Sequence, residues 1–213
     1  MSKKTQIVGG VGVVAVLLVG FFLYTSRPLA APTTTVTSGD TAAKQGEQVF
    51  VIDNTKSTAT YEIDETLNGQ PVRVVGVANQ VNGTIVLNTA NPAASRVEGI
   101  TINARTFKTD NERRDNTVGR MILKSEEPAN ELITFKLVEM FETPEAIKDG
   151  EKFPFSITGE LTIAGVTKEV AFNGEATKTS KTLVGMTESV INYSDFGLVI
   201  PKLPFLAWVD DKV

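Results

Sequence analysis

Along most of the chain after residue 49, apolar and polar residues alternate with a period of two. The clearest stretch is residues 153–163, in which odd-numbered positions are apolar or glycine and even-numbered positions are polar or proline. Past Ala164–Gly165 the parity reverses, and the apolar residues become Val166, Val170 and Phe172. A two-residue turn places the residues on either side of it opposite each other, so a β-hairpin requires this reversal. The pattern predicts two antiparallel strands, each with one buried and one solvated face.

Six further stretches have strand character and end at glycine, asparagine, proline or charged residues. They are Thr58–Ile63, Val72–Ala78, Gly83–Asn88, Arg96–Ala104, Leu132–Phe141 and Leu183–Ile191. One short helix is predicted at Val118–Lys124 and a single helical turn at Tyr193–Phe196. No stretch after residue 49 shows a long period of 3.6, so the fold class is all-β, either a barrel or a sandwich of antiparallel strands.

The beginning of the chain has a different character. After Lys3 and Lys4, an uncharged apolar run extends over Ile7–Tyr24. As a helix, these eighteen residues would span roughly 27 Å, close to the bilayer core of about 30 Å. The run is longer than the apolar core of a signal peptide, and Pro28–Ala30 is a poor cleavage site. We therefore expect a transmembrane helix within residues 1–24, with a cleaved signal peptide as the alternative.

The next segment, residues 25–48, is rich in Thr, Ser, Pro and Ala and has no apolar period, which predicts a flexible linker. The folded domain is then residues 49–213. Because positively charged residues favour the cytoplasmic side of a membrane, Lys3 and Lys4 predict a cytoplasmic N-terminus for this single-pass protein. Its domain would lie outside the cytoplasmic membrane, in the periplasm or the extracellular space.

Composition removes several classes of function. The 213 residues include no histidine and no cysteine, which excludes histidine-based triads, thiol catalysis and zinc sites built from these residues. The net charge of −4 gives no basic field that would attract a phosphate backbone, so we expect no nucleic-acid partner. The serines have no histidine base and no Gly-x-Ser-x-Gly elbow. We therefore expect a protein that is not an enzyme, with no catalytic residues and no metal.

Several motifs resemble those of the YceI-like family. The stretch Thr158–Val170, TGELTIAGVTKEV, resembles the family's G-x-L-T-I-x-G-V-T-K-x-V hairpin. The stretch Ile191–Leu198 is similar to its I-N-R-S-D-F-G segment, with Tyr193 in place of the arginine. Arg114–Asp115 followed by Ile133–Phe135 resembles a loop with an R-D pair that leads into I-T-F. The ordered match runs from residue 49 to the end of the chain.

This resemblance implies an eight-stranded antiparallel, lipocalin-like barrel with a long apolar tunnel. Family members are known for polyisoprenoid ligands, such as isoprenoid quinones or polyprenyl chains, and are typically exported. The chain stops at Val213, where family members begin their final strand, so we expect that strand to be missing. Its absence would leave two unpaired edges and a slot in the wall. The stretch Asn68–Arg73 is longer than the family's loop after the first strand, which predicts a changed tunnel mouth.

The residues expected to line the tunnel are apolar and lie on the predicted inner face. They are Phe135, Leu137, Phe155, Ile157, Leu161, Val170, Phe172 and Met186. The alternation alone favours an ordinary filled core, and the family resemblance reverses that preference. Arg113 and Arg114 would contact a quinone carbonyl or a phosphate head group at the mouth. The competing interpretation is a structural brace between Arg114 and Asp115, or a solvated surface.

The sequence therefore predicts a non-enzymatic carrier or sequestering protein for a long apolar lipid, a polyisoprenoid or an isoprenoid quinone. Its partners would be that lipid and, through the N-terminal helix, the membrane, and the protein would be a monomer or a homodimer. The alternative is a protein interaction module with a filled core. Such a module would bind another chain by strand addition at a barrel edge after Phe205–Trp208.

Overall fold

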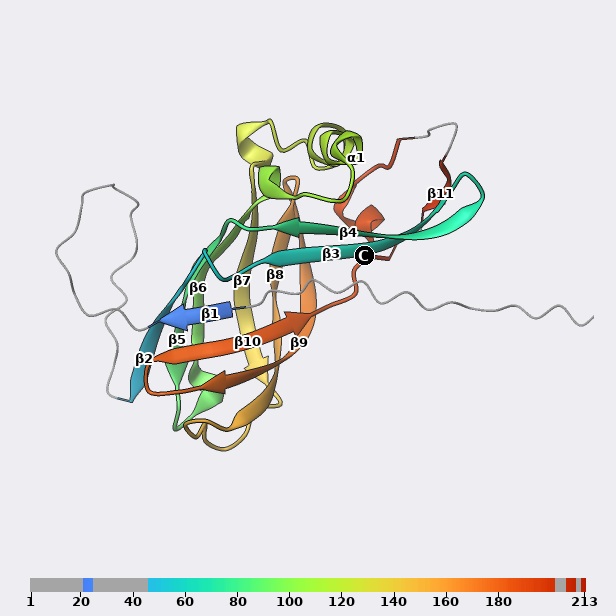
Figure 1. Ribbon diagram of the computed structural model, residues 1–213. Coiled ribbons are helices and arrows are strands. Elements are labelled where there is room, and N and C mark those ends of the chain that lie inside the picture. The colour runs from blue at the N-terminus through green and yellow to red at the C-terminus, as the bar shows by residue number, and fades with distance from the viewer. Residues whose placement is uncertain (1–20, 25–45, 202–205, 210–211) are drawn as a thin grey trace, which may run out of the picture.

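A computed structural model describes residues 21–24, 46–201, 206–209 and 212–213 of the chain. Its main feature is an antiparallel barrel in which the strands follow the order β1-β10-β9-β8-β7-β6-β5-β2 (Figure 1). The barrel strands are β1 (Phe21–Tyr24), β2 (Glu47–Ile52), β5 (Val81–Asn88), β6 (Arg96–Asn103), β7 (Leu132–Phe141), β8 (Lys152–Ile163), β9 (Val166–Lys178) and β10 (Thr182–Glu188). The all-β barrel expected from the sequence is thus confirmed.

A second, three-stranded sheet lies at one end of the barrel. It consists of β11 (Leu206–Val209), β3 (Ala59–Leu67) and β4 (Gln70–Ala78), in that order. Figure 1 shows the β3–β4 hairpin beside helix α1 and extending beyond the barrel. The short helices are η1 (Pro92–Ala94), η2 (Ala104–Thr106), α1 (Glu112–Thr117), η3 (Val118–Ile122, a π-helical turn), η4 (Pro128–Asn130) and η5 (Tyr193–Phe196).

The hairpin predicted from the parity reversal is present as β8 and β9. Ile163 pairs directly with Val166 across the turn. Ala164 and Gly165 both have positive φ, 47° and 79°, as the primed turn that matches the strand twist requires. The turn predicted at Tyr193–Phe196 is η5. The local sequence pattern was therefore sufficient to predict both the hairpin and the helical turn.

The short helix predicted at Val118–Lys124 is present in part as the π-helical turn η3 (Val118–Ile122), whereas helix α1 before it was not predicted. Helix α1 begins at Glu112, because the Asn111 side chain accepts hydrogen bonds from the backbone N–H groups of Arg113 and Arg114 at 2.9 and 3.3 Å. Such a cap satisfies N–H groups that have no partner within the helix. The chain then continues into the π-helical turn η3.

The long loop predicted at Asn68–Arg73 is also wrong. Asn68 and Gly69 form a two-residue turn with positive φ at both positions, 49° and 77°, and the strand resumes at Gln70. Asn-Gly is the preferred sequence for this turn. The hairpin is therefore tight, and it extends the second sheet rather than forming a loose loop.

Two expectations about the chain ends need correction. Seven strands form a continuous wall from β10 to β2, and β1 fills the gap between them, so the expected slot is closed by Phe21–Tyr24. These four residues end the apolar run that was predicted as a transmembrane helix; the rest of the run and nearly all of the predicted linker lie outside the described residues. Within the described part, no helix is long and apolar enough to cross a bilayer. The expected barrel edge after Phe205–Trp208 is wrong, because Leu206–Val209 lies outside the barrel and forms β11, an end strand of the second sheet that pairs with β3.

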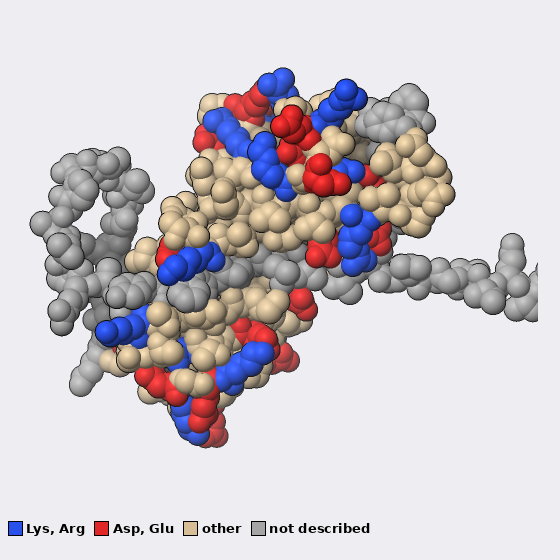
Figure 2. Space-filling model, in the orientation of Figure 1, with Lys and Arg blue, Asp and Glu red and all other residues tan. Residues whose placement is uncertain are grey.

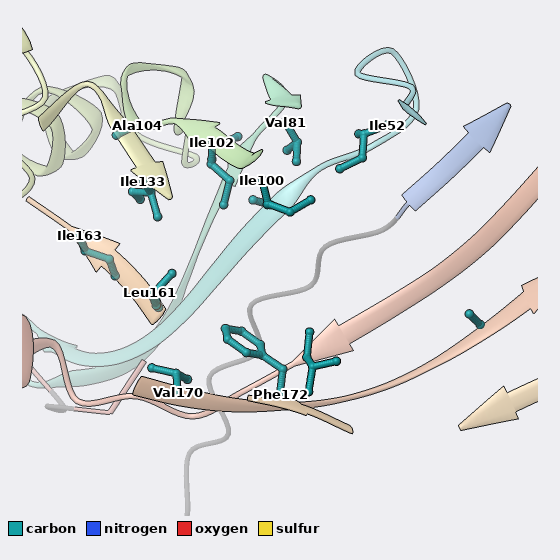
Figure 3. Packing of buried hydrophobic residues seen from close by; sticks show 14 of the residues in the cluster. Ile52, Val81, Ile100, Ile102, Ala104, Ile133, Leu161, Ile163, Val170 and Phe172 are labelled. Atoms are coloured by element: carbon teal, nitrogen blue, oxygen red, sulfur yellow. The ribbon is translucent and has the colours of Figure 1, made fainter. Parts of the chain in front are cut away.

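The core occupies the barrel interior. Figure 3 shows Ile100, Ile102 and Ile133 pointing toward Leu161 and Phe172 across it. All five side chains are buried and belong to one hydrophobic cluster. Burial of apolar surface on this scale is the main source of stability for a domain without disulfides.

The end of the barrel opposite α1 is closed by the loop between β7 and β8. Ile147 in this loop is buried, and its N–H donates to the Thr89 carbonyl at 2.8 Å. Lys178 is only 4% exposed and pairs with Asp149, while the Gly150 N–H donates to the Lys178 carbonyl at 2.7 Å. A molecule inside the barrel would therefore not leave at this end without moving the loop.

Candidate ligand-binding site

The barrel encloses a small apolar cavity of about 80 Å³. Strands β5 to β10 contribute its wall, which includes five of the residues predicted to line a tunnel: Phe135, Phe155, Ile157, Leu161 and Phe172. Ligand pockets for drug-sized molecules usually measure about 300–1,000 Å³. The barrel interior as it stands is therefore mostly filled core with limited free space.

Aromatic rings lying over glycines account for this filling. A Cβ atom at Gly174 would lie 2.6 Å from Cζ of Phe155, and one at Gly159 would overlap the ring of Phe135. The rings of Phe135 and Phe172 also meet edge to face, with centroids 5.3 Å apart, a favourable arrangement for two aromatic side chains. The free volume of the barrel thus depends on the orientation of these three rings.

A larger cavity of about 370 Å³ lies at the α1 end of the barrel. Its walls come from β3 and β4, from α1 and η3, and from the segment that follows β10. Apolar examples from these walls are Ile63, Val74, Val118, Ile191 and Leu198. We call this space the mouth cavity; its volume falls within the usual range for a small-molecule site.

The two cavities adjoin. Ile133 lines both of them. A third, very small space lies between, and it shares Leu161 and Phe172 with the barrel cavity and Tyr61 and Ile191 with the mouth cavity. The mouth cavity and the barrel cavity therefore lie next to each other, and mainly apolar side chains stand between them.

Polar groups gather at the mouth around α1, where Figure 2 shows positive and negative side chains close together. Arg114 donates to Glu65 on β3 at 3.0 Å and also pairs with Asp110. Asp115 instead accepts hydrogen bonds from the N–H and Oγ1 of Thr109, both at 2.7 Å. The brace expected between Arg114 and Asp115 is therefore wrong: Arg114 ties α1 to β3, and Asp115 holds the turn before α1.

Comparison with family models matches residues 50–213 to the YceI-like domain. The chain belongs to the YceI-like family. This agrees with the barrel and with the apolar cavity inside it, since the family is known for barrel proteins that bind lipids and polyisoprenoids.

Solved structures resemble this chain to different degrees. BcnA from Burkholderia cenocepacia aligns with a TM-score of 0.55 and 16% sequence identity, over 73% of this chain and 90% of that one. A YceI protein from Campylobacter jejuni aligns with a TM-score of 0.45 and 25% identity, over 58% of this chain and 70% of that one. At this identity the likeness to BcnA establishes the fold alone. Among curated proteins, none matches the chain.

Arg113 differs from its neighbour in this YceI-like domain. It lines the mouth cavity and is exposed, and its guanidinium has no hydrogen-bond or ion-pair partner among the residues that the structure describes. Its backbone N–H is already satisfied by Asn111. Arginine offers planar donors that suit carboxylate, phosphate or carbonyl oxygens. Of the two predicted head-group residues, Arg113 is the one whose donors are available.

Tyr61 lies where the two cavities meet. Its ring covers Gly76 on the paired strand, where a Cβ atom would overlap the ring, and its centroid is 5.3 Å from that of Phe107. Its hydroxyl is buried and has no hydrogen-bond partner within the described part of the chain. Burial raises the pKa of Tyr61 above its ordinary value, although the positive charge of Arg114 opposes the shift. Such an unpaired buried hydroxyl is costly and rare.

Three of the predicted lining residues lie elsewhere. Val170 and Leu137 pack in or against the core but do not line the barrel cavity. A bulge in β7 between Leu137 and Glu139 brings Met140 to the cavity wall instead. The assignment of Met186 to the tunnel lining is wrong, because its side chain is 39% exposed. Its two neighbours on β10, Gly185 and Thr187, line the barrel cavity instead.

Most residues that line the mouth cavity were not predicted from the sequence. Its walls include Ile63, Leu67 and Val74 from the β3–β4 hairpin, together with Ile200 and Pro201. The apolar alternation on both sides of Asn68–Gly69 was a usable signal for the hairpin. Its position over the barrel end depends on tertiary contacts, which no local pattern reveals.

Proposed function

We propose that this YceI-like domain binds an amphiphilic lipid without chemical change, with the apolar tail in the barrel and the polar head in the mouth cavity. One observation carries the proposal: a partly polar cavity of about 370 Å³ adjoins an apolar cavity inside the barrel. The family's lipid-binding character supports it. A polyisoprenoid or an isoprenoid quinone fits this description.

The tail would be held by apolar contact. Each methylene removed from water contributes about 0.8 kcal/mol, so several isoprene units would suffice for firm binding after the costs of ordering. The free volume near Phe135, Phe155 and Phe172 is small, so a long tail would need these rings to turn. Rotation of aromatic side chains is a common adjustment on binding, even where the backbone stays in place.

The head would be held by Arg113. A hydrogen bond to a charged group is worth about 1.5–3 kcal/mol, and the guanidinium has no competing partner among the described residues. Arg114 plays a different part, since its donors already serve Glu65 and Asp110. It would shape the mouth rather than contact the ligand.

The location of the protein belongs to the same proposal. An apolar segment before the domain would keep the barrel at the outer side of the cytoplasmic membrane, which supplies lipids with long apolar tails. Carriage between membranes and sequestration both follow from reversible burial of the tail. A protein interaction module with a filled core would not require a mouth cavity of this size.

The test is to purify the full chain, extract it with organic solvent and identify the bound lipids by mass spectrometry. A stoichiometric polyprenyl lipid or quinone is the expected result. Arg113→Gln should then weaken binding of that lipid by about tenfold. The matched control is Arg120→Gln, which removes the same charge from an exposed arginine that pairs with Glu126 at 2.8 Å and does not line the cavity. Only trace mixed phospholipid from a folded sample would refute the proposal.

A further inference from the structure

Strand β1 is the shortest barrel strand that the structure describes, and it closes the wall between β10 and β2 (Figure 1). It pairs along its four residues with Thr182–Gly185 of β10. With β2 it pairs over only two residues, at Leu23 with Ile52 and at Tyr24 with Val51. By contrast, β8 and β9 pair along twelve residues. The junction at β1, which we call the seam, is therefore the part of the wall held by the shortest pairing.

The seam is also a wall of the binding cavity. Leu183 and Gly185 of β10 line the barrel cavity, and they are the residues that pair with Leu23 and Phe21 of β1. Removing β1 would leave the edges of β10 and β2 unpaired and expose the side of the cavity between them. Such edges readily pair with another strand.

Three exposed apolar side chains lie on the outer surface beside the seam. Val51 and Val184, which pair with Tyr24 and Phe22, are 50% and 38% exposed, and Met186 on β10 is 39% exposed. A lipid surface is a suitable environment for side chains of this kind.

The residues of β1 are also the last four of the apolar run Ile7–Tyr24. The whole run is long enough, as a helix, to span roughly 27 Å, whereas the fourteen residues that precede β1 would span roughly 21 Å, well short of a bilayer core of about 30 Å. The same residues therefore cannot complete a membrane span while they close the barrel.

We propose that Phe21–Tyr24 serves as a removable seam: when the apolar run inserts into a bilayer, β1 leaves the barrel and opens the binding cavity toward the membrane between β2 and β10. The partner of this face is a lipid bilayer, and the ligand passes sideways between bilayer and barrel. The inference rests on the proposed function for the identity of the cargo. The opening itself requires no cargo, so it is testable separately.

The experiment uses two engineered disulfides in the full chain, which has no cysteine of its own. Phe22→Cys with Val184→Cys joins directly paired residues across the seam. Thr162→Cys with Thr167→Cys joins directly paired residues in the β8–β9 hairpin, whose hydroxyls lie 2.8 Å apart. Opposite residues of antiparallel strands have Cα separations of about 4.5–5.5 Å, which suits a disulfide.

Each variant is oxidised with and without phosphatidylcholine–phosphatidylglycerol vesicles, and the cross-linked fraction is measured by mass spectrometry. Without vesicles both pairs should cross-link. With vesicles the seam pair should cross-link about tenfold less while the hairpin pair is unchanged, because the membrane shifts the population away from the closed seam. Chains that stay fully cross-linked at the seam while inserted in vesicles would overturn the inference. It would equally fail if the seam pair never cross-linked, or if the full chain did not insert into vesicles.

These outcomes are distinct from failure of the proposed function. If no lipid is extracted from the protein but the seam pair responds to vesicles, the seam inference stands and the cargo assignment falls. If a lipid is extracted but the seam pair is indifferent to vesicles, the carrier function stands and the ligand passes through the mouth cavity instead.

Discussion

Replacing Tyr61 with phenylalanine is expected to stabilise the protein. The hydroxyl is buried without a partner within the described part of the chain, and leaving a buried polar group unpaired costs about 1–3 kcal/mol. Phenylalanine retains the ring that covers Gly76 and packs against Phe107. We expect Tyr61→Phe to raise the free energy of unfolding by about 1 kcal/mol, or the melting temperature by about 2–4 °C for a domain of this size.

The same substitution should change how stability depends on pH. Burial raises the pKa of Tyr61 in the folded state, whereas in the unfolded chain its pKa is near the ordinary value of about 10. Above that pH the unfolded state loses this proton before the folded state does, so the contribution of Tyr61 to stability falls as pH rises. The difference in stability between Tyr61→Phe and wild type should therefore widen in favour of the variant above about pH 10.

Urea denaturation at pH 7 and at alkaline pH measures both effects. Ser156→Ala is the control, because the Ser156 hydroxyl is buried but bonded to Glu142 and Asn173. Its removal should lower stability by about 1 kcal/mol, opposite in sign to Tyr61→Phe. If Tyr61→Phe lowered stability, or if its advantage did not grow with pH, the hydroxyl would have a partner and the reasoning would be refuted.

Three further predictions concern stability and are checked by urea denaturation. Arg114→Gln should cost about 1–3 kcal/mol, because it leaves the buried Glu65 without its guanidinium, and an effect near zero would contradict the brace. Gly76→Ala should destabilise by about 1–3 kcal/mol, because the added Cβ overlaps the Tyr61 ring, and the cost should shrink when Tyr61→Ala is added. Lys178→Met should be neutral or stabilising, whereas Asp149→Ala should destabilise by leaving a buried ammonium unpaired.

The parts of the fold that sequence analysis predicted are those whose causes are local. The β8–β9 hairpin depends on the parity of residues on either side of Ala164–Gly165, and the structure pairs Ile163 with Val166 as that parity requires. The inward positions of Phe155 and Leu161 follow from the same alternation. Met186 was misassigned because the loop between β9 and β10 does not reveal which parity the next strand adopts.

The parts that sequence analysis missed depend on residues far apart in the chain. Arg113 and Arg114 are equivalent in sequence, and they differ because Glu65, forty-nine residues away, pairs with one of them. The apolar residues of Phe21–Tyr24 suit a helix or a strand equally well, since short apolar runs carry no periodicity that distinguishes the two. The gap between β2 and β10 decides in favour of a strand, and that gap exists only in the folded barrel.

The two cavities divide the work of selection between different parts of the chain. The barrel cavity is almost wholly apolar. It can distinguish tails by length and shape, since each buried methylene contributes about 0.8 kcal/mol of binding free energy, but among the described residues it offers no hydrogen-bonding group that would select a polar head. The mouth cavity holds the available donors, and most of its walls come from β3, β4, α1 and the segment after β10, which lie outside the barrel wall. Changes in those elements would alter the preferred head group while leaving the barrel intact. Under the proposed function, membership of the YceI-like family therefore indicates the tail more strongly than the head, and we expect the head group to be selected by Arg113 and the residues around it.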